Sequence, residues 1–146
     1  MNKEEIIKQI KSNISLYSCF ICPDYPDLGI YTSQYEDIII KLFDNAKRTS
    51  SLIYNDVNKL SVVNERYGKE QGDKTLYSLL KLFTKSMPSD SITIRIGGDE
   101  FITFVPNKTK EEVTKILHSI KSNIAAQKSQ LFGTSITFGI ADSSLR

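Results

Sequence analysis

The segment from residue 92 to residue 105 limits the fold more than any other part of the sequence. Isoleucines at positions 92, 94 and 96 alternate with Thr93 and Arg95, which is the two-residue period of a half-buried strand. A second strand-like run follows at residues 101–105, and Gly97-Gly98-Asp99-Glu100 separates the two runs. This arrangement predicts a β-hairpin that carries carboxylates at its tip.

The elements expected around the hairpin define the fold class. From residue 50 onward their order is strand, two helices, hairpin, helix and strand, and Thr109 with Glu112 forms a capping box that opens the last helix. This order is typical of an α+β protein with a ferredoxin-like or palm-type antiparallel sheet and helices packed on one face. We expect a strand at 52–56, helices at 58–67, 72–86 and 109–128, and a strand at 135–141.

The N-terminal segment has a different pattern. Isoleucines at positions 6, 7, 10 and 14 recur at helical spacing. We therefore divide the chain into an amphipathic helix with a linker at 1–23 and one domain at 24–146. The helix could bury its apolar side against a partner helix or against the domain itself. A second helix is expected to start near Thr32 or Ser33, because either side chain can cap it.

Composition excludes several classes of protein. The 146 residues carry 19 basic and 17 acidic side chains, a net charge of +2, and no apolar run approaches the ~18–20 residues of a membrane helix. Neither the net charge nor a basic–aromatic stretch favours nucleic-acid binding. We expect one domain without a membrane segment, located in the cytoplasm.

The metal-binding residue types other than carboxylates are scarce. Cys19 and Cys22 form a single CxxC pair, and the chain has one histidine, His118. A structural zinc site needs four ligands, so we interpret the cysteines as reduced thiols near a helix end. His118 is expected in solvent, because it lies off the apolar face of its helix.

The carboxylates at the hairpin suggest chemistry. Asp56 ends the strand at 52–56, and a ferredoxin-like sheet would bring it close to Asp99 and Glu100. Oxygen ligands of this kind favour Mg²⁺ or Mn²⁺. Gly97 and Gly98 could adopt positive φ and let a nucleotide approach the backbone. The alternative is an ordinary hairpin with a glycine-rich acidic turn.

Three segments together resemble the GGDEF family of diguanylate cyclases. Residues 97–101 read Gly-Gly-Asp-Glu-Phe, with Arg95 two positions earlier. Residues 56–73 are similar to the family's second motif, and residues 135–141 to its last-strand motif. The resemblance covers roughly residues 24–142. It implies a nucleotide-cyclase-like fold and a bacterial signalling enzyme that condenses two GTP molecules into cyclic di-GMP, with release of pyrophosphate.

The resemblance also implies roles for individual residues. Asp56, Asp99 and the Val57 carbonyl would bind the metal, and Glu100 would be a further ligand or accept the proton of the 3′-hydroxyl. The other implied contacts are with GTP: Asn64 and Asp73 would read guanine, the amides of Lys59 and Leu60 would hold phosphate, and Gly97 and Gly98 would line the nucleotide. One GTP would come from each subunit of a homodimer.

The chain departs from the family pattern at several positions. Ser61 stands where a lysine is usual, and Lys69 where a histidine is usual. Residues 24–33 keep little of the family's first motif, and residues 88–91 replace the RxxD of the inhibitory product site. Family members also continue into a helix whose lysine and arginine contact the γ-phosphate, and this sequence ends at Arg146 before such a helix. These departures keep open a degenerate, non-catalytic GGDEF module that binds GTP or a protein partner. A palm-type polymerase domain is a weaker third hypothesis.

Overall fold

The computed structural model describes residues 5, 25 and 27–145. Apart from residue 5, the helix expected within residues 1–23, with Cys19 and Cys22, lies outside these residues, so its packing stays a prediction. In the described ranges, no helix is both long and apolar enough to cross a bilayer.

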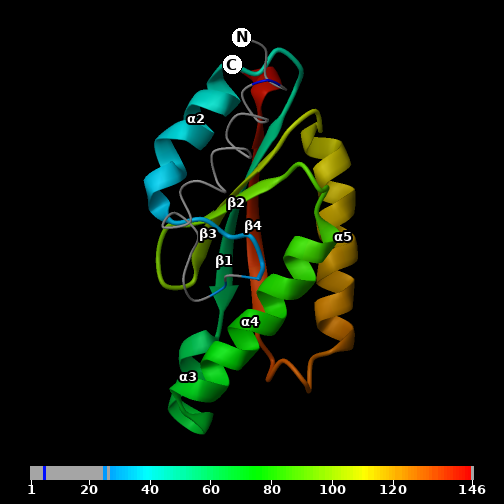
Figure 1. The fold of residues 1–146 in the computed structure, drawn as a ribbon. Helices are drawn as coiled ribbons and strands as arrows, with labels where there is room; N and C mark the ends of the chain where they lie inside the picture. The colour runs from blue at the N-terminus through cyan, green and yellow to red at the C-terminus, as the bar shows by residue number, and fades with distance from the viewer. Residues whose placement is uncertain (1–4, 6–24, 26, 146) are drawn as a thin grey trace.

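A four-stranded antiparallel sheet forms the centre of the molecule, in the order β2-β3-β1-β4 (Figure 1). Every neighbouring pair is antiparallel, which confirms the ferredoxin-like arrangement. The strands are β1 (Ser51–Asn58), β2 (Ile92–Arg95), β3 (Glu100–Val105) and β4 (Ser135–Asp142). A short 3₁₀ turn, η3 (Ser143–Leu145), follows β4.

Two helices cover one face of the sheet. These are α4 (Lys69–Ser86) and α5 (Lys110–Ala126), and they enclose the larger core between themselves and the sheet. His118 is exposed on α5, as expected. Side chains from both helices and from three strands meet in this core, among them Leu79, Phe83, Ile120, Ile53, Phe101 and Ile136.

A shorter helix covers part of the opposite face. It is α2 (Glu36–Asp44), preceded by the 3₁₀ turn η2 (Ser33–Tyr35). Ile39 and Leu42 pack there against Ile92, Ile94 and Phe104 in a second, smaller core. The one-face arrangement was expected for the elements from residue 50 onward, and α2 precedes them in the chain. Thr32 precedes η2 but makes no capping bond with its side chain, and α2 itself begins only at Glu36.

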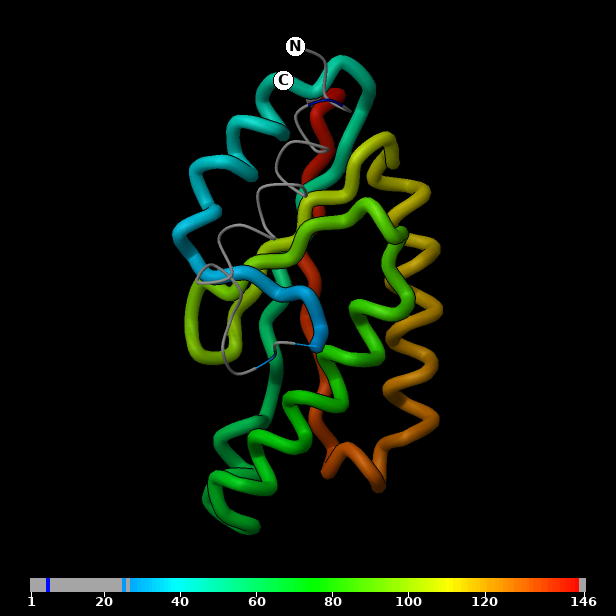
Figure 2. Tube along the Cα trace, viewed as in Figure 1, coloured from blue at the N-terminus to red at the C-terminus, as the bar shows by residue number. Residues whose placement is uncertain are grey.

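The connection after β1 begins later than the sequence suggested. β1 continues to Asn58, because it pairs with β4 along its whole length, and α3 (Leu60–Tyr67) follows. Gly68, at φ +90°, separates α3 from α4, a conformation that glycine adopts without strain. Helix α4 then starts at Lys69, so Gly72 lies inside it rather than at its start. Figure 2 shows α3 at the opposite end of the molecule from α2.

Strand β2 is buried on both of its faces, although its alternation predicted burial on one. Ile92 and Ile94 face α2, and Thr93 on the other face is only 6% exposed. The Thr93 and Thr103 hydroxyls hydrogen-bond each other across the strands at 2.9 Å, so Thr93 is buried with its polar atom satisfied.

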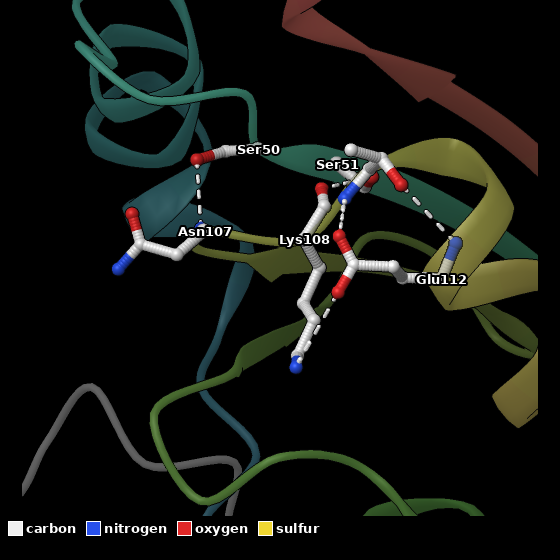
Figure 3. A network of polar contacts seen from close by, with 6 residues as sticks. Ser50, Ser51, Asn107, Lys108 and Glu112 are labelled. Atoms are coloured by element: carbon white, nitrogen blue, oxygen red, sulfur yellow. Dashed lines mark hydrogen bonds and ion pairs between the residues drawn. The ribbon is translucent and has the colours of Figure 1, made fainter.

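A polar network joins the start of β1, the end of β3 and the start of α5 (Figure 3). Thr109 Oγ1 accepts from the Glu112 amide, and Glu112 Oε1 accepts from the Thr109 amide, so the predicted capping box is confirmed. The buried Ser51 hydroxyl donates to the Lys108 carbonyl at 2.8 Å. Asp142, at the end of β4, accepts from the Lys110 amide at 2.8 Å. These bonds fix α5 against the sheet.

Candidate functional site

The pairing of β1 with β3 brings the predicted acidic residues together. Asp56 lies directly opposite Glu100 in the antiparallel register. Just beyond this pair, the Val57 amide donates to the Asp99 carbonyl at 3.1 Å. Residues distant in the sequence therefore meet where β1 approaches the hairpin turn. All four residues predicted to hold metal are at this place: Asp56, Val57, Asp99 and Glu100.

The hairpin turn is held by an arginine and not by unusual backbone angles. Arg95 donates from Nε to the Gly97 carbonyl at 3.1 Å and from Nη2 to the Gly98 carbonyl at 2.7 Å. The expectation of positive φ was wrong, because neither glycine is among the described residues with positive φ. A Cβ on Gly97 would lie 3.4 Å from Glu100 Oε2, whereas one on Gly98 would meet nothing within 4 Å. A side chain at either position would therefore meet at most an ordinary van der Waals contact within the described residues.

The acidic residues change the pKa of a neighbouring tyrosine, Tyr54. It is 39% exposed and lies two residues before Asp56, on the same face of β1. Partial burial, a hydrogen bond to Glu100 and the charges of Glu100, Asp56 and Asp99 together raise the pKa of Tyr54 above its ordinary value. The Tyr54 hydroxyl therefore stays protonated at neutral pH and can donate to Glu100.

The chemistry of these donors fits a hard divalent cation. Two carboxylates lie on facing strands, a third lies in the adjoining turn, and such oxygen ligands suit Mg²⁺ or Mn²⁺. Within the described residues, no group of three or more Asp, Glu, His or Cys side chains is arranged to hold a metal. Binding of the metal stays a prediction. A cation here would need ligands from outside these side chains, as Mg²⁺ sites that use phosphate and water do.

Asn64 and Asp73 lie on the two helices that follow β1. A Cβ built on Gly72 would come within 1.6 Å of Asn64 Oδ1, so the Asn64 side chain occupies the space above that glycine. Asp73 is the next residue along α4. The structure therefore places the two predicted guanine-reading residues at one contact between α3 and α4, and both are exposed.

Lys59 has an unusual backbone conformation at the junction of β1 and α3. Its φ of 66° and ψ of 15° are left-handed, a region that costs a non-glycine residue about 1–2 kcal/mol. The Lys59 carbonyl accepts from the Val63 amide at 3.3 Å, and Leu60 begins the helix. The amides of Lys59 and Leu60 thus stand at the positive end of the α3 dipole, where phosphate oxygens are favoured.

The segment at 88–91, which replaces the RxxD motif, lines a different pocket. This pocket has a volume of about 390 Å³ and lies beside the start of β2. Pro88 and Ser91 line it, and its described lining contains no charged residue. We expect no product inhibition through a motif of that kind here.

Sequence reasoning missed the supporting roles of three residues. Arg95 was noted only as a companion of the glycine pair, whereas it hydrogen-bonds both of their carbonyls. Tyr54 and Gly72 were not singled out. The position of Tyr54, two residues before Asp56 on a strand, was the one available signal, because residues at i and i+2 share a face. Nothing in the sequence indicated that Gly72 lies against Asn64.

Comparison with known proteins identifies the family. The family model described as "Diguanylate cyclase, GGDEF domain" matches residues 33–144, well over half of the chain. The chain belongs to the GGDEF family. Its sheet order and its hairpin of glycines and acidic residues are thus those of a GGDEF domain.

Named relatives match this GGDEF domain over a limited part of their own length. "Uncharacterized protein YhcK" of Bacillus subtilis is 28% identical over 102 residues, 66% of this chain and 28% of that protein. "Diguanylate cyclase DosC" of Escherichia coli is 29% identical over 87 residues, 58% of this chain and 19% of that protein. The chain therefore spans less than a third of the length of these relatives.

Solved structures share the GGDEF fold. A structure of the coiled coil and GGDEF domain of DgcB from Caulobacter crescentus, in complex with c-di-GMP, has a TM-score of 0.73 at 13% identity. It covers 93% of this chain and 76% of that one. The active GGEEF domain of a diguanylate cyclase from Vibrio cholerae has a TM-score of 0.60 at 21% identity, over 75% and 67% of the two chains. At these identities the likeness concerns the fold alone.

Proposed function

We propose that this GGDEF domain is a diguanylate cyclase, which joins two GTP molecules into cyclic di-GMP and releases two molecules of pyrophosphate. One observation carries the proposal. The pairing of Asp56 with Glu100, with Val57 bonded to Asp99, gathers the acidic residues at the start of the helix pair that carries Asn64 and Asp73. A nucleotide could then place its base at the helices and its phosphates at the acidic residues.

The acidic residues would hold the divalent cation. Asp56, Asp99, Glu100 and the Val57 carbonyl supply oxygen donors for Mg²⁺ or Mn²⁺. When bound, the cation neutralises phosphate charge and favours ionisation of an attacking hydroxyl. The protein contributes the placement of these donors, because Arg95 hydrogen-bonds the Gly97 and Gly98 carbonyls of the turn.

The remaining side chains would bind and orient GTP. The Asp73 carboxylate can accept hydrogen bonds from guanine N1–H and the exocyclic amine, and the Asn64 amide can both donate and accept. Adenine would leave the Asp73 carboxylate without these donors, which favours guanine. In this proposal Glu100 accepts the proton of the 3′-hydroxyl. That oxygen then bonds to the α-phosphorus of the GTP on a second subunit, and the bond to pyrophosphate breaks.

Incubation with GTP and Mg²⁺ tests the proposal. We expect the wild-type chain, at a concentration high enough to form dimers, to produce cyclic di-GMP detectable by liquid chromatography and mass spectrometry. Asp56→Asn and Glu100→Gln should each lower the rate by about 10²-fold or more, because each removes a group at the reacting atoms. Glu111→Gln, which removes an exposed carboxylate on α5, should leave the rate unchanged.

The same assay separates the proposal from its alternative. GTP binding measured by calorimetry without any product at high protein concentration would overturn the cyclase proposal. It would favour the non-catalytic module that binds GTP. Ser61 and Lys69, which replace the usual lysine and histidine, are the sequence features that support this alternative.

A further inference from the structure

A groove lies between α3 and the segment that joins α5 to β4, and Figure 1 shows both at the same end of the molecule. Its volume is about 430 Å³, within the ~300–1,000 Å³ typical of ligand pockets. Helix α3 contributes Val62, Arg66 and Tyr67, and the joining segment contributes Lys128 and Phe132. We call the groove lined by these five residues the aromatic groove.

Three of these side chains are largely apolar and yet exposed. Val62 is 42% exposed, Tyr67 57% and Phe132 36%, and neither hydrophobic core of the described chain includes them. The Tyr67 and Phe132 rings contact each other, with their centroids 4.8 Å apart and their planes inclined at 51°. Large apolar side chains that gather on a surface in this way are typical of sites that bind another molecule.

The backbone at Phe132 is strained, and its ring lies on the surface. The Gly133 amide donates to the Lys128 carbonyl at 3.0 Å. A second bond joins the Phe132 amide to the Ser129 carbonyl at 3.3 Å, and the two form a Schellman turn, in which glycine usually takes the left-handed position. Phe132 takes that position here, at φ 55°, while the preceding Leu131 is buried. Glycine would close the same turn without strain, so the turn does not explain the phenylalanine.

Two cations flank the apolar side chains. Arg66 and Lys128 line the groove, and its described lining contains no aspartate or glutamate. Neither cation takes part in the ion pairs found between described residues. A partner that fills the groove and neutralises these charges must therefore combine an apolar group with acidic groups.

Shape and charge together select one kind of partner. A second copy of this chain is disfavoured, because a two-fold contact through the groove would bring Arg66 and Lys128 toward the same cations of the other copy. A bilayer surface accepts side chains that protrude into it, whereas this site is concave and receives a side chain. A polypeptide segment with an aromatic or leucine side chain flanked by aspartate or glutamate fits both the concavity and the charge.

The aromatic groove lies apart from the residues that would read guanine. Val62 and Arg66 are four residues apart and share one side of α3. Asn64, two residues from each, lies on the other side, where it contacts Gly72 of α4. A partner seated in the groove therefore leaves the contact between Asn64 and Gly72 uncovered.

We propose that the aromatic groove binds an acidic segment of a partner protein. One aromatic or leucine side chain of that segment packs against Tyr67 and Phe132, and its carboxylates pair with Arg66 and Lys128. The proposal goes beyond the proposed function and does not depend on it, because no residue of the groove belongs to the proposed active site. The partner and GTP can be bound together.

Selection from a displayed library of short random peptides, with the full chain as bait, tests this inference. We expect the enriched peptides to share an aromatic or leucine residue flanked by aspartate or glutamate. Fluorescence anisotropy with one synthesised peptide of this kind then measures affinity. Phe132→Gly and the double variant Arg66→Gln/Lys128→Gln should each bind it about tenfold or more weakly than wild type. Added salt should weaken the wild-type complex more than the complex of the double variant.

Matched controls remove similar side chains outside the groove. Ile40→Ala shortens an apolar side chain of α2 that is 40% exposed, and Lys85→Gln/Lys115→Gln removes two exposed lysines. Both should bind the peptide as wild type does. Phe132→Gly should keep or raise the melting temperature, because glycine takes the left-handed position without strain. Loss of binding by this folded variant separates a docking role of Phe132 from a role in stability.

Several outcomes would overturn the inference. One is that wild type enriches no peptide, and another is that the enriched peptides lack acidic residues. Peptides that bind Phe132→Gly and Arg66→Gln/Lys128→Gln as tightly as wild type would count equally against it. Sedimentation with vesicles of phosphatidylcholine and phosphatidylglycerol that wild type binds and Phe132→Gly does not would assign the groove to a lipid surface, and would overturn the proposal of a protein partner.

Discussion

The Asn64 side chain rests directly against Gly72, and it can do so because glycine has no Cβ. The Asn64 amide fills the space that a Cβ on Gly72 would need, and the nearest approach would be only 1.6 Å. Asn64 is therefore held against the turn of α4 that carries Asp73. In the proposed function these two side chains read the same base, so the geometry at Gly72 affects recognition although Gly72 offers no side chain to the ligand.

Replacing Gly72 by alanine should weaken GTP binding without lowering the stability of the fold. The clash is with the end of a flexible side chain, and alanine favours a helix interior by about 1 kcal/mol, so we expect the free energy of unfolding to be kept or raised. GTP affinity should fall by about tenfold or more, because Asn64 is displaced from guanine. Chemical denaturation and calorimetry measure the two effects.

A double-mutant cycle provides the control for this prediction. In an Asn64→Ala background, Gly72→Ala has no amide left to displace and should not weaken GTP binding further. A Gly72→Ala protein that binds GTP as tightly as wild type would contradict the role given to Asn64.

At the scale of elements, α5 depends on carboxylates at its N-terminus. Glu112 closes the capping box with Thr109, and Asp142 accepts from the Lys110 amide at 2.8 Å (Figure 3 shows Glu112). Hydrogen bonds from the Ser144 hydroxyl and the Lys110 amide lower the pKa of Asp142. A hydrogen bond from the Thr109 amide, together with nearby Lys108, lowers the pKa of Glu112. Both groups are thus more acidic in the folded chain than in the unfolded one.

This difference predicts loss of stability in acid. A carboxyl group whose pKa is depressed by folding stabilises the protein fully above its unfolded pKa, about 4 for Asp and Glu, and loses that contribution as pH falls through the folded value. We expect the melting temperature to fall between about pH 5 and pH 2. The double variant Asp142→Asn/Glu112→Gln should start lower and show a shallower slope.

The control for the acid prediction is on the same turn of α5. Glu111→Gln removes one exposed carboxylate outside the capping network and should keep the wild-type slope. Equal slopes in wild type and in Asp142→Asn/Glu112→Gln would show that these carboxylates do not carry the acid sensitivity.

The types of the elements were predictable, whereas several of their bounds were not. The capping box located the start of α5 to within a residue, because that signal is local. The strand expected at 52–56 extends over Ser51–Asn58, because β4 pairs with it as far as Asn58. Gly72 suggested a helix start, yet it lies inside α4, where the Asn64 side chain of α3 rests against it. Pairing and packing between distant segments decided these positions.

At the scale of the whole molecule, the hydrophobic cores lie on the faces of the sheet, and the candidate site lies at one end of it. α4 and α5 bury the larger core on one face, and α2 covers part of the other (Figure 1). The acidic residues and the helix pair that carries Asn64 and Asp73 gather toward the end where β1 leads into α3. In the proposed reaction one such site holds one GTP, so cyclisation needs two copies of the chain.

The requirement for two copies predicts how activity depends on protein concentration. Where sedimentation shows mainly monomer, the rate of cyclic di-GMP formation per mole of protein should rise in proportion to protein concentration, because the active species is a dimer. With GTP in excess, initial rates across a dilution series measure this dependence. A constant specific activity in the monomeric range would contradict the dimeric mechanism.

The sequence alone determined the fold class and the residues of the candidate site. Hydrophobic periods, glycines and the capping box are local signals, and Gly-Gly-Asp-Glu-Phe with Asp56, Asn64 and Asp73 indicated the family. Tertiary structure alone decided which of these residues meet. The register that sets Asp56 between Glu100 and Thr137 arises from pairing of strands far apart in the chain. The amide of Asn64 lies above Gly72 because α3 packs against α4. Periodicity describes one element at a time, and it carries no information about such contacts.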